Sequence, residues 1–321
     1  MNSAHDGTAI LFGGRSRERL VSVATAQGLS EILPAAELWF WHASGQVRRV
    51  DRAVLLAHTR PFEAAFAGAG APVAETLELA LDAAARDARV LVIALHGGEG
   101  EDGRVAALCE ARGVGFTGSG SRASRLAFDK AQAKAAVAAA GVPTCPSLVV
   151  STKTLAVEVE AWRRRWGRLV AKPVMEGSSY GLVFIEAAQD IAAVARLAEE
   201  VPYLVEPFLS GPEASVAVVE DAGRLQALPP VEIAPEPGRA FDYAGKYLGD
   251  GVREFCPGRF SAEDERALRA AAVRAHLALG ARGYSRSDFI VTAEGPVFLE
   301  LNTLPGLTGA SLFPIALGAG G

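Results

Sequence analysis

The chain has 321 residues, enough for two or three domains, and 50% of them are apolar, so it can bury a sizeable core. Charged residues make up 21%, and no long polar or repetitive tract occurs, which excludes a disordered chain. The net charge of −5 argues against nucleic acid or an anionic membrane surface as the main partner. We therefore expect a small-molecule ligand, no nucleic acid and no membrane.

The apolar stretches do not predict a membrane-spanning helix, because those near residues 135–152 and 301–321 contain proline and glycine. The first residues lack the basic and apolar regions of a secretory leader, so we expect a cytoplasmic protein. Cys109, Cys145 and Cys256 are odd in number and have no CxxC spacing, which favours reduced thiols over a disulfide framework or a zinc site.

The N-terminal third is typical of alternating strands and helices. Strands are expected at residues 9–12, 37–41 and 90–95, and helices at about 21–29 and 76–86. The last of these strands is a continuous apolar run, as in parallel strands covered on both faces. The pattern predicts an α/β domain over residues 1–118, which ends where TGSGS interrupts it.

The remainder predicts two α+β domains, over residues 119–209 and 210–321. The first opens with one Ala-rich helix at 121–140 and continues with strands near 147–150, 169–172 and 182–185, joined by antiparallel connections. Strands at 204–206 and 214–219 are expected to begin the following segment. Its long helix starts at the Ser261-x-x-Asp264 box and ends at Gly280, before strands at 288–291 and 297–300. The loop at 235–251 is long enough to act as a lid.

Two glycine-containing segments are candidates for phosphate binding. Gly13-Gly14 follows a strand, but GGRSRE lacks the G-x-G-x-x-G fingerprint, so a tight strand-to-helix turn is as good an interpretation as a dinucleotide site. In AKPVMEGSSYG, residues 171–181, a strand delivers Lys172 and the following loop offers backbone N–H groups and hydroxyls to phosphate oxygens. An ordinary hairpin turn remains the alternative for this segment.

A set of oxygen ligands lies near the C-terminus. Glu300 and Asn302 are two residues apart on one expected strand and therefore share a face, and Asp288 lies on the strand before it with Arg286 on the same face. Two carboxylates and an amide oxygen suit Mg²⁺, which completes its coordination with nucleotide phosphates. Burial of these groups without ions to pair with would be costly, so we interpret them as functional.

These segments together resemble the D-alanine:D-alanine ligases of the ATP-grasp superfamily. The resemblance covers nearly the whole chain and rests on an ordered series of motifs: GGRSRERLVS, ALHGGEGEDG, FTGSGSRASRLAFDKAQAK, KPVMEGSSYG, VEPFLSGPE, FDYAGKYLGD, GYSRSDF and ELNTLPGLTGASL. It implies a three-domain fold in which an N-terminal parallel α/β domain is followed by two α+β domains that sandwich ATP.

The resemblance also implies which residues bind the nucleotide and metal. Lys130 and Lys172 match the lysines that grip ATP, and Lys246 matches a lid lysine that approaches its phosphates. The adenine and ribose contacts match Glu206, Phe208, Leu209 and Glu213. Asp288, Glu300 and Asn302 match the ligands of Mg²⁺, with Mn²⁺ as an alternative ion.

For the substrates, the family forms an acyl phosphate from the first D-alanine, and the amine of the second D-alanine then displaces phosphate. Glu18 matches the carboxylate that takes the first ammonium, with Ser178 and Tyr247 as its partners. Arg286 and the N–H of Gly306 match the oxyanion donors, and Ser311 matches the serine facing the second carboxylate. His96 matches a histidine near the first substrate, although a lone histidine after a buried strand is more often structural than an acid or base.

The expected function is ATP-dependent synthesis of D-alanyl-D-alanine for peptidoglycan precursors, by a homodimer. Two alternatives remain: an ATP-grasp ligase that joins other amino or hydroxy acids, and a nucleotide-binding paralogue without catalysis. Leu20 stands where the family's common pattern has an acidic residue. Family members usually continue past the last motif into a final helix, so we expect apolar surface of the third domain to be exposed or covered by a partner.

Overall fold

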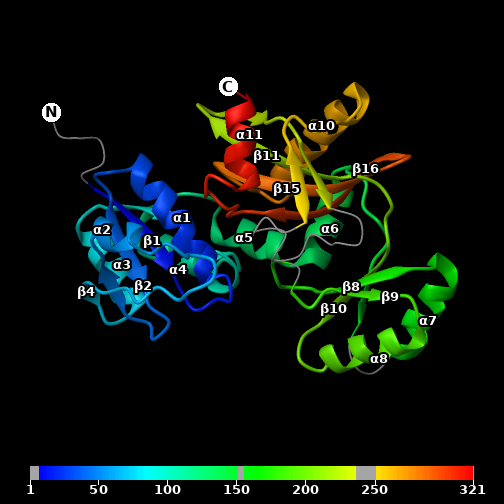
Figure 1. Cartoon of the computed structure of the whole chain (residues 1–321), viewed down its shortest axis with the longest axis horizontal. Coiled ribbons are helices and arrows are strands. Elements are labelled where there is room, and N and C mark those ends of the chain that lie inside the picture. The colour runs from blue at the N-terminus through cyan, green and yellow to red at the C-terminus, as the bar shows by residue number, and fades with distance from the viewer. Residues whose placement is uncertain (1–6, 151–154, 179, 236–250, 321) are drawn as a thin grey trace.

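The computed structural model describes residues 7–150, 155–178, 180–235 and 251–320. The chain forms three sheets in sequence order, each with its own helices (Figure 1). Within the described residues, none of the helices is both long and apolar enough to cross a membrane.

The first sheet has the strand order β4-β3-β2-β1-β5-β6, with β1 parallel to β2 and β5. Its strands are β1 (Thr8–Gly13), β2 (Glu37–Trp41), β3 (Val47–Arg49), β4 (Ala71–Ala74), β5 (Val90–Ile93) and β6 (Gly115–Phe116). Its helices are α1 (Arg19–Ile32), α2 (Arg52–Leu56), α3 (Leu77–Arg86) and α4 (Arg104–Glu110), with a 3₁₀ turn at Gly98–Gly100. Residues of α1 and α2 pack on one face of β1, and residues of α3 and α4 pack on the other. The apolar run at 90–95 therefore forms a doubly covered parallel strand, as predicted.

The second sheet is antiparallel, in the order β7-β10-β8-β9. Its strands are β7 (Leu148–Val150), β8 (Leu169–Pro173), β9 (Val183–Ile185) and β10 (Tyr203–Pro207), and α7 (Leu155–Trp166) and α8 (Ala188–Leu197) cover one face (Figure 1). The strand expected at 204–206 was assigned to the following segment, and this was wrong. As β10 it lies in the middle of the second sheet, because it pairs with both β7 and β8.

The single helix expected at 121–140 is in fact two helices, α5 (Ser121–Phe128) and α6 (Lys130–Ala139). Asp129 separates them with extended backbone (ψ 100°), and its carboxylate accepts a hydrogen bond from the N–H of Gln132 at 3.0 Å. An aspartate at this position caps the new helix, which explains the break. Both helices contribute to the core of the third sheet, where Ala127 and Val137 share a cluster with Phe298.

The third sheet has the order β14-β13-β11-β15-β16, and β12 pairs with β11. Its strands are β11 (Glu213–Asp221), β12 (Arg224–Ala227), β13 (Val231–Pro235), β14 (Val252–Phe255), β15 (Tyr284–Thr292) and β16 (Gly295–Asn302). Helix α10 (Ala262–Ala278) starts at Ser261, whose hydroxyl caps Asp264 N–H as predicted, and its buried residues pack on this sheet. The chain continues into α11 (Leu312–Gly320), which packs on Val231 and Ile233 through Phe313 and Ala316.

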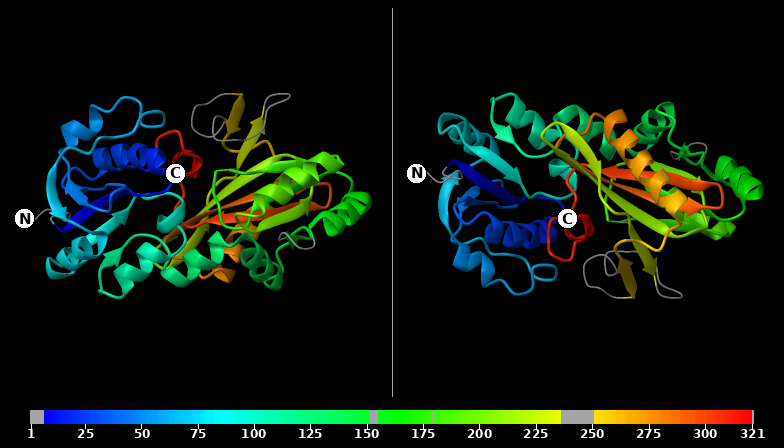
Figure 2. Two further views of the ribbon diagram at one scale, coloured as in Figure 1. Left: turned by 90° about the horizontal axis from the view of Figure 1, so that it is seen from below. Right: turned by 90° about the horizontal axis from the view of Figure 1, so that it is seen from above.

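The segment after β16 joins the third sheet to the first domain. Leu304 is buried in the cluster on one face of the first sheet, together with Leu11 and Leu95. Leu307 packs against the cluster on the other face of the first sheet. In both views of Figure 2 this red C-terminal segment lies between the blue first domain and the third sheet. The loop ends of the first sheet therefore face β15 and β16 directly.

Candidate active site

A small cavity of about 80 Å³ lies where the first domain, the loop after β8 and the end of β16 meet. It is lined by six of the predicted substrate residues: Glu18, His96, Ser178, Arg286, Gly306 and Ser311. Asn302, predicted as a metal ligand, also lines it. Tyr247 lies outside the described residues.

A large cavity of about 390 Å³ adjoins it, between the second and third sheets. It is lined by six of the predicted nucleotide residues: Lys130, Lys172, Glu206, Phe208, Leu209 and Glu213. Asp288 and Glu300 line its floor on the third sheet, whereas Lys246 lies outside the described residues. Four residues line both cavities: Lys130, Glu176, Gly177 and Glu300. A ligand in the large cavity therefore directly adjoins one in the small cavity.

Strands β15 and β16 bring the predicted metal ligands together with Arg286. Their register pairs Arg286 with Asn302 and Asp288 with Glu300. Arg286 forms a two-pronged ion pair with Asp288, at 3.0 and 2.9 Å, and the Ser215 hydroxyl donates to the same carboxylate at 2.7 Å. Glu300 lies 3.4 Å from the Lys130 ammonium. Among the described residues, no group of three or more His, Cys, Asp or Glu side chains is arranged so that it could hold a metal ion.

Glu206 is buried between two lysines. The Lys172 ammonium lies 2.8 Å from one carboxylate oxygen, and Lys134 bonds the other. Burial alone raises the pKa of Glu206, but Lys172 and Lys134 outweigh it, so the pKa lies below its ordinary value. Burial likewise opposes the charge of Lys172, and the Glu206 and Glu300 carboxylates reverse this and raise its pKa. Glu206 and Lys172 are therefore charged at neutral pH.

Glu18 lies against two backbone segments that only glycine allows to come so close. A Cβ on Gly177 would lie 2.7 Å from Glu18 Oε1, and one on Gly97 would lie 3.1 Å from Oε2. The Glu18 N–H donates to Ser16 Oγ at 3.1 Å. The loop after β8 is thus held against the first domain, and Ser178 in it has a φ of 49°, a conformation unfavourable for a residue with a side chain.

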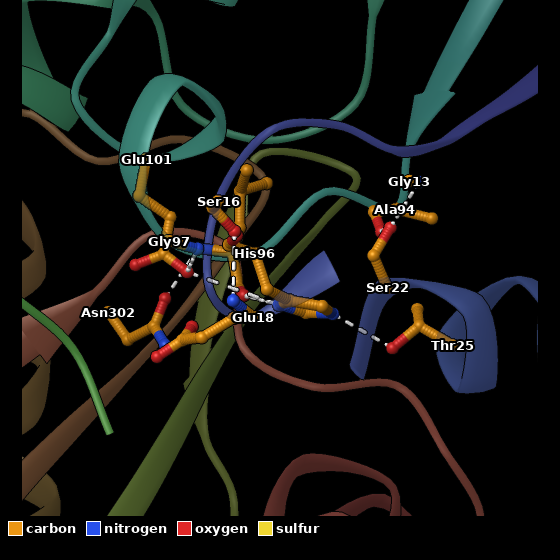
Figure 3. A network of polar contacts seen from close by, with 11 residues as sticks. Gly13, Ser16, Glu18, Ser22, Thr25, Ala94, His96, Gly97, Glu101 and Asn302 are labelled. Atoms are coloured by element: carbon orange, nitrogen blue, oxygen red, sulfur yellow. Dashed lines mark hydrogen bonds and ion pairs between the residues drawn. The ribbon is translucent and has the colours of Figure 1, made fainter. Parts of the chain in front are cut away.

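His96 connects the first domain to the segment after β16 (Figure 3). Its Nδ1 donates to the Leu304 carbonyl at 3.1 Å, so Nε2 accepts from Thr25 Oγ1 at 2.8 Å. Burial lowers its pKa to about 4, despite the opposing effect of the Leu304 carbonyl. With both nitrogens bonded and the ring neutral, this geometry favours the structural interpretation of His96 over an acid–base role.

Glu101 lines the small cavity and was not among the predicted site residues. Its carboxylate accepts from Gly97 N–H at 2.9 Å and lies 3.9 Å from His96 Nδ1. Figure 3 shows it close to Glu18 and Asn302. Burial, and then the nearby Glu18 carboxylate, raise the pKa of Glu101 to about 8. The HGGEGEDG motif contains this residue, but an acidic residue in a loop does not by itself indicate burial.

Gly306 and Ser311 line the same small cavity as Glu18. A Cβ on Gly306 would lie 2.7 Å from Ser311 Oγ, so a larger residue there would displace the Ser311 hydroxyl. The Ser311 hydroxyl accepts from Thr308 N–H at 3.2 Å and exchanges a hydrogen bond with Thr308 Oγ1 at 2.7 Å. A polar group is therefore fixed immediately before α11, in the lining of the small cavity.

The sequence matches two family models, described as D-ala D-ala ligase N-terminus over residues 7–119 and D-ala D-ala ligase C-terminus over residues 137–321. Curated relatives named D-alanine--D-alanine ligase include one from Bordetella pertussis, 35% identical over 100% of this chain and 92% of its own. Another, from Halalkalibacterium halodurans, is 34% identical over 96% of this chain and 92% of its own. A third, from Cupriavidus taiwanensis, is 38% identical over 97% of this chain and 86% of its own.

Solved structures agree in fold. VanG D-Ala:D-Ser ligase from Enterococcus faecalis superposes with a TM-score of 0.79 at 26% identity, covering 98% of this chain and 95% of that one. D-alanyl-alanine synthetase A from Vibrio cholerae superposes with a TM-score of 0.79 at 23% identity, covering 100% of this chain and 95% of that one.

The large cavity lies between two antiparallel sheets and is lined by lysines and carboxylates, and the solved structures that share this fold are ligases. The chain therefore has the architecture of an ATP-grasp enzyme. The two matched models together cover most of the sequence, and several relatives exceed 30% identity over nearly its full length. The chain belongs to the D-alanine–D-alanine ligase family.

Proposed function

We propose that this protein joins two D-alanine molecules to D-alanyl-D-alanine at the expense of ATP, for peptidoglycan precursor synthesis in the cytoplasm. The observation that carries the proposal is the pair of adjoining cavities, one of nucleotide size and one of amino-acid size, which share Lys130 and Glu300. Family membership supports the same chemistry. The homodimer expected from the resemblance is part of the proposal, and sedimentation analysis tests it.

The large cavity is proposed to bind ATP. Apolar and aromatic side chains, among them Val170, Phe184 and Phe208, offer faces for a purine. Glu206 would accept a hydrogen bond from its amino group, and Glu213 would accept from the ribose hydroxyls. Lys130 and Lys172 would hold phosphate oxygens, because compact ammonium groups suit that position.

A divalent metal is expected with ATP, and Mg²⁺ is the proposed ion. Asp288, Glu300 and Asn302 would hold it, since they supply adjacent hard oxygens at the junction of the two cavities. When bound, such an ion neutralises charge on the transferring phosphoryl group. The ion pair between Arg286 and Asp288 supports a role for Asp288 as a partner of cations.

The first D-alanine is proposed to sit with its ammonium at Glu18. Its carboxylate oxygen attacks the γ-phosphorus, the bond from phosphorus to the bridging oxygen breaks, and ADP leaves. The deprotonated amine of the second D-alanine then attacks the acyl carbon, phosphate leaves, and the nitrogen loses a further proton. Arg286 and the Gly306 N–H would stabilise the negative charge on the tetrahedral intermediate. Ser311 would face the second carboxylate.

A second candidate is a ligase that accepts a different second substrate. It is favoured by the structural neighbour VanG, which is a D-Ala:D-Ser ligase. The two candidates differ only in the partner that attacks the acyl phosphate.

One experiment tests both candidates. Phosphate release from ATP and the product mass are measured with D-alanine alone, and with D-alanine paired with D-serine, D-lactate or L-alanine. The proposal expects D-alanyl-D-alanine from D-alanine alone, in one-to-one ratio with phosphate. ATP binding without phosphate release in any combination would instead favour the non-catalytic paralogue.

A further inference from the structure

Lys134 is a buried lysine that ends the motif FTGSGSRASRLAFDKAQAK but has no proposed role. It lies on α6 one turn after Lys130, and its side chain is 3% exposed. Its ammonium bonds the Glu206 carboxylate and lies 3.1 Å from Cys145 Sγ. Glu206 and Cys145 line the large cavity, but Lys134 does not. Lys134 therefore stands behind the cavity wall and acts on a ligand only through its neighbours.

The Glu206 carboxylate divides its two oxygens between two lysines. Lys134 bonds Oε1, and Lys172 lies 2.8 Å from Oε2. Glu206 and Lys134 are both almost completely buried, so each depends on the other for compensation of its charge. The arrangement places two positive charges around one negative charge.

This excess of positive charge matters because Lys172 has two possible anionic partners. In the structure it contacts Glu206, but its proposed role requires it to hold a phosphate oxygen of ATP. If Lys172 were the sole partner of Glu206, moving it to phosphate would leave a buried carboxylate without a counter-charge, which is strongly unfavourable. Lys134 holds the other oxygen, so Glu206 stays ionised and fixed while Lys172 contacts phosphate.

We propose that Lys134 is a positioning residue for nucleotide recognition: it holds Glu206 through Oε1, so that Oε2, once Lys172 contacts phosphate, accepts a hydrogen bond from the exocyclic amino group of adenine. This inference rests on the proposed function of Glu206. Lys134 would thereby set the preference of the enzyme for a purine with a 6-amino group, although it touches no part of the nucleotide.

The test compares ATP with purine riboside triphosphate, which lacks the 6-amino group, as nucleotides for dipeptide formation. We expect the wild type to prefer ATP by about tenfold or more in kcat/KM, because a buried carboxylate left without its donor is penalised. Lys134→Met should reduce this preference to about threefold or less and raise the KM for ATP, without raising the KM for D-alanine. Ala135→Met, on the exposed side of the same helix, is the matched control and should retain the wild-type preference.

A double-mutant cycle with Glu206→Gln separates this inference from the function on which it rests. If Glu206→Gln keeps the full preference for ATP, Glu206 does not contact the base, and the proposed nucleotide assignment fails. If Glu206→Gln removes the preference but Lys134→Met keeps it, the role of Lys134 is overturned while the assignment stands. If Glu206 contacts the base and Lys134 positions Glu206, adding Lys134→Met to Glu206→Gln should not reduce the preference for ATP further.

A folding defect in Lys134→Met would also be informative. The double variant Lys134→Met/Glu206→Gln contains neither buried charge, so it should recover thermal stability relative to Lys134→Met alone. Failure to recover would overturn the electrostatic coupling. Lys134→Arg keeps the positive charge and should retain more of the preference for ATP than Lys134→Met does.

Discussion

Surroundings, more than residue type, decide the charge of each acidic side chain in this site. Glu101 and Glu206 are both buried, yet burial and the neighbouring Glu18 raise the pKa of Glu101 to about 8, whereas two lysines hold that of Glu206 below its ordinary value. Glu206 is therefore an anion at neutral pH, and Glu101 is mainly a neutral acid that can donate a hydrogen bond.

Glu101→Gln tests that assignment through the pH dependence of stability. The folded chain holds the Glu101 proton up to about pH 8, whereas the unfolded chain releases it near the ordinary value of 4.5. Stability from this group is present below pH 4.5 and is lost as the pH rises towards 8. The neutral amide should remove this loss and stabilise the protein by about 1 kcal/mol or more at pH 8 relative to pH 5. Thermal unfolding of the wild type and the variant at pH 5 and pH 8 measures this difference in stability. The same change in stability at both pH values would contradict the raised pKa of Glu101.

Arg286→Lys tests the need for a guanidinium. A lysine keeps the charge but cannot form the two-pronged contact that Arg286 makes with Asp288. Since Arg286 is proposed to stabilise an oxyanion, we expect kcat to fall by about 10- to 100-fold with little change in the KM for ATP. Arg269→Lys is the control, because Arg269 pairs with Glu265 on α10. A rise in the KM for ATP at constant kcat would assign Arg286 to the nucleotide instead.

The residues that sequence reasoning missed share a physical cause. Glu101 and Lys134 are types that normally lie in solvent, and only tertiary contacts bury them. Glu101 is buried at the Gly97 turn, where it accepts the Gly97 N–H, and Lys134 is buried because Glu206 arrives from β10, 72 positions along the chain. The strand pair carrying Asp288 and Glu300 was accessible to prediction because period-two spacing is local.

At the scale of elements, the loop after β8 is the connection between the substrate and nucleotide regions. Gly177 lines both cavities and leaves no room for a side chain beside Glu18. Arg17, next to Glu18 in sequence, lies over the Tyr180 ring at 5.8 Å, which adds a second contact between this loop and the first domain. Loop and first domain therefore shape one site.

Gly177→Ala should displace the Glu18 carboxylate, because the added Cβ would lie 2.7 Å from Oε1. We expect the KM for the first D-alanine to rise by about tenfold, equivalent to about 1.4 kcal/mol, with a smaller effect on ATP. Gly318→Ala in α11, where an added Cβ meets nothing within 4 Å, is the control for glycine replacement. Steady-state kinetics with D-alanine and ATP varied in turn measure the two KM values. Equal increases in both KM values would contradict a selective contact with Glu18.

Errors in the predicted elements came from competition between local and long-range preferences. The Ala-rich pattern at 121–140 is uniformly helical, but Asp129 offers its carboxylate to the next turn and starts a new helix. The strand at 203–207 looks like its neighbours in sequence, and only its pairing with β7 and β8 places it in the second sheet. Period and composition predict that a strand exists, but not which strands it pairs with.

At the scale of the whole molecule, the three sheets do not have equally independent cores. The cluster under the second sheet contains residues only from that sheet and its helices, between 148 and 205. The first-domain cluster, in contrast, includes Leu304 from the segment after β16, and Tyr284 of β15 packs against it. The first and third domains thus share a core, and we expect the second sheet, which has its own core, to move over the large cavity as a separate unit.

Leu304→Ala should loosen the first domain without loosening the second. Removing this buried side chain should cost about 2 to 5 kcal/mol, since the surrounding cluster cannot collapse fully onto the space. The substitution should also weaken the hydrogen bond from His96 Nδ1 to the Leu304 carbonyl, because the backbone there is fixed by the side chain's packing. Hydrogen exchange followed by segment should become faster in β1, β2 and β5 and stay unchanged in β8 and β10. Leu169→Ala, in the separate second cluster, should give the reverse pattern. Faster exchange in all three domains from either substitution would mean that the molecule unfolds as one cooperative unit, and the separate motion inferred for the second sheet would have to be given up.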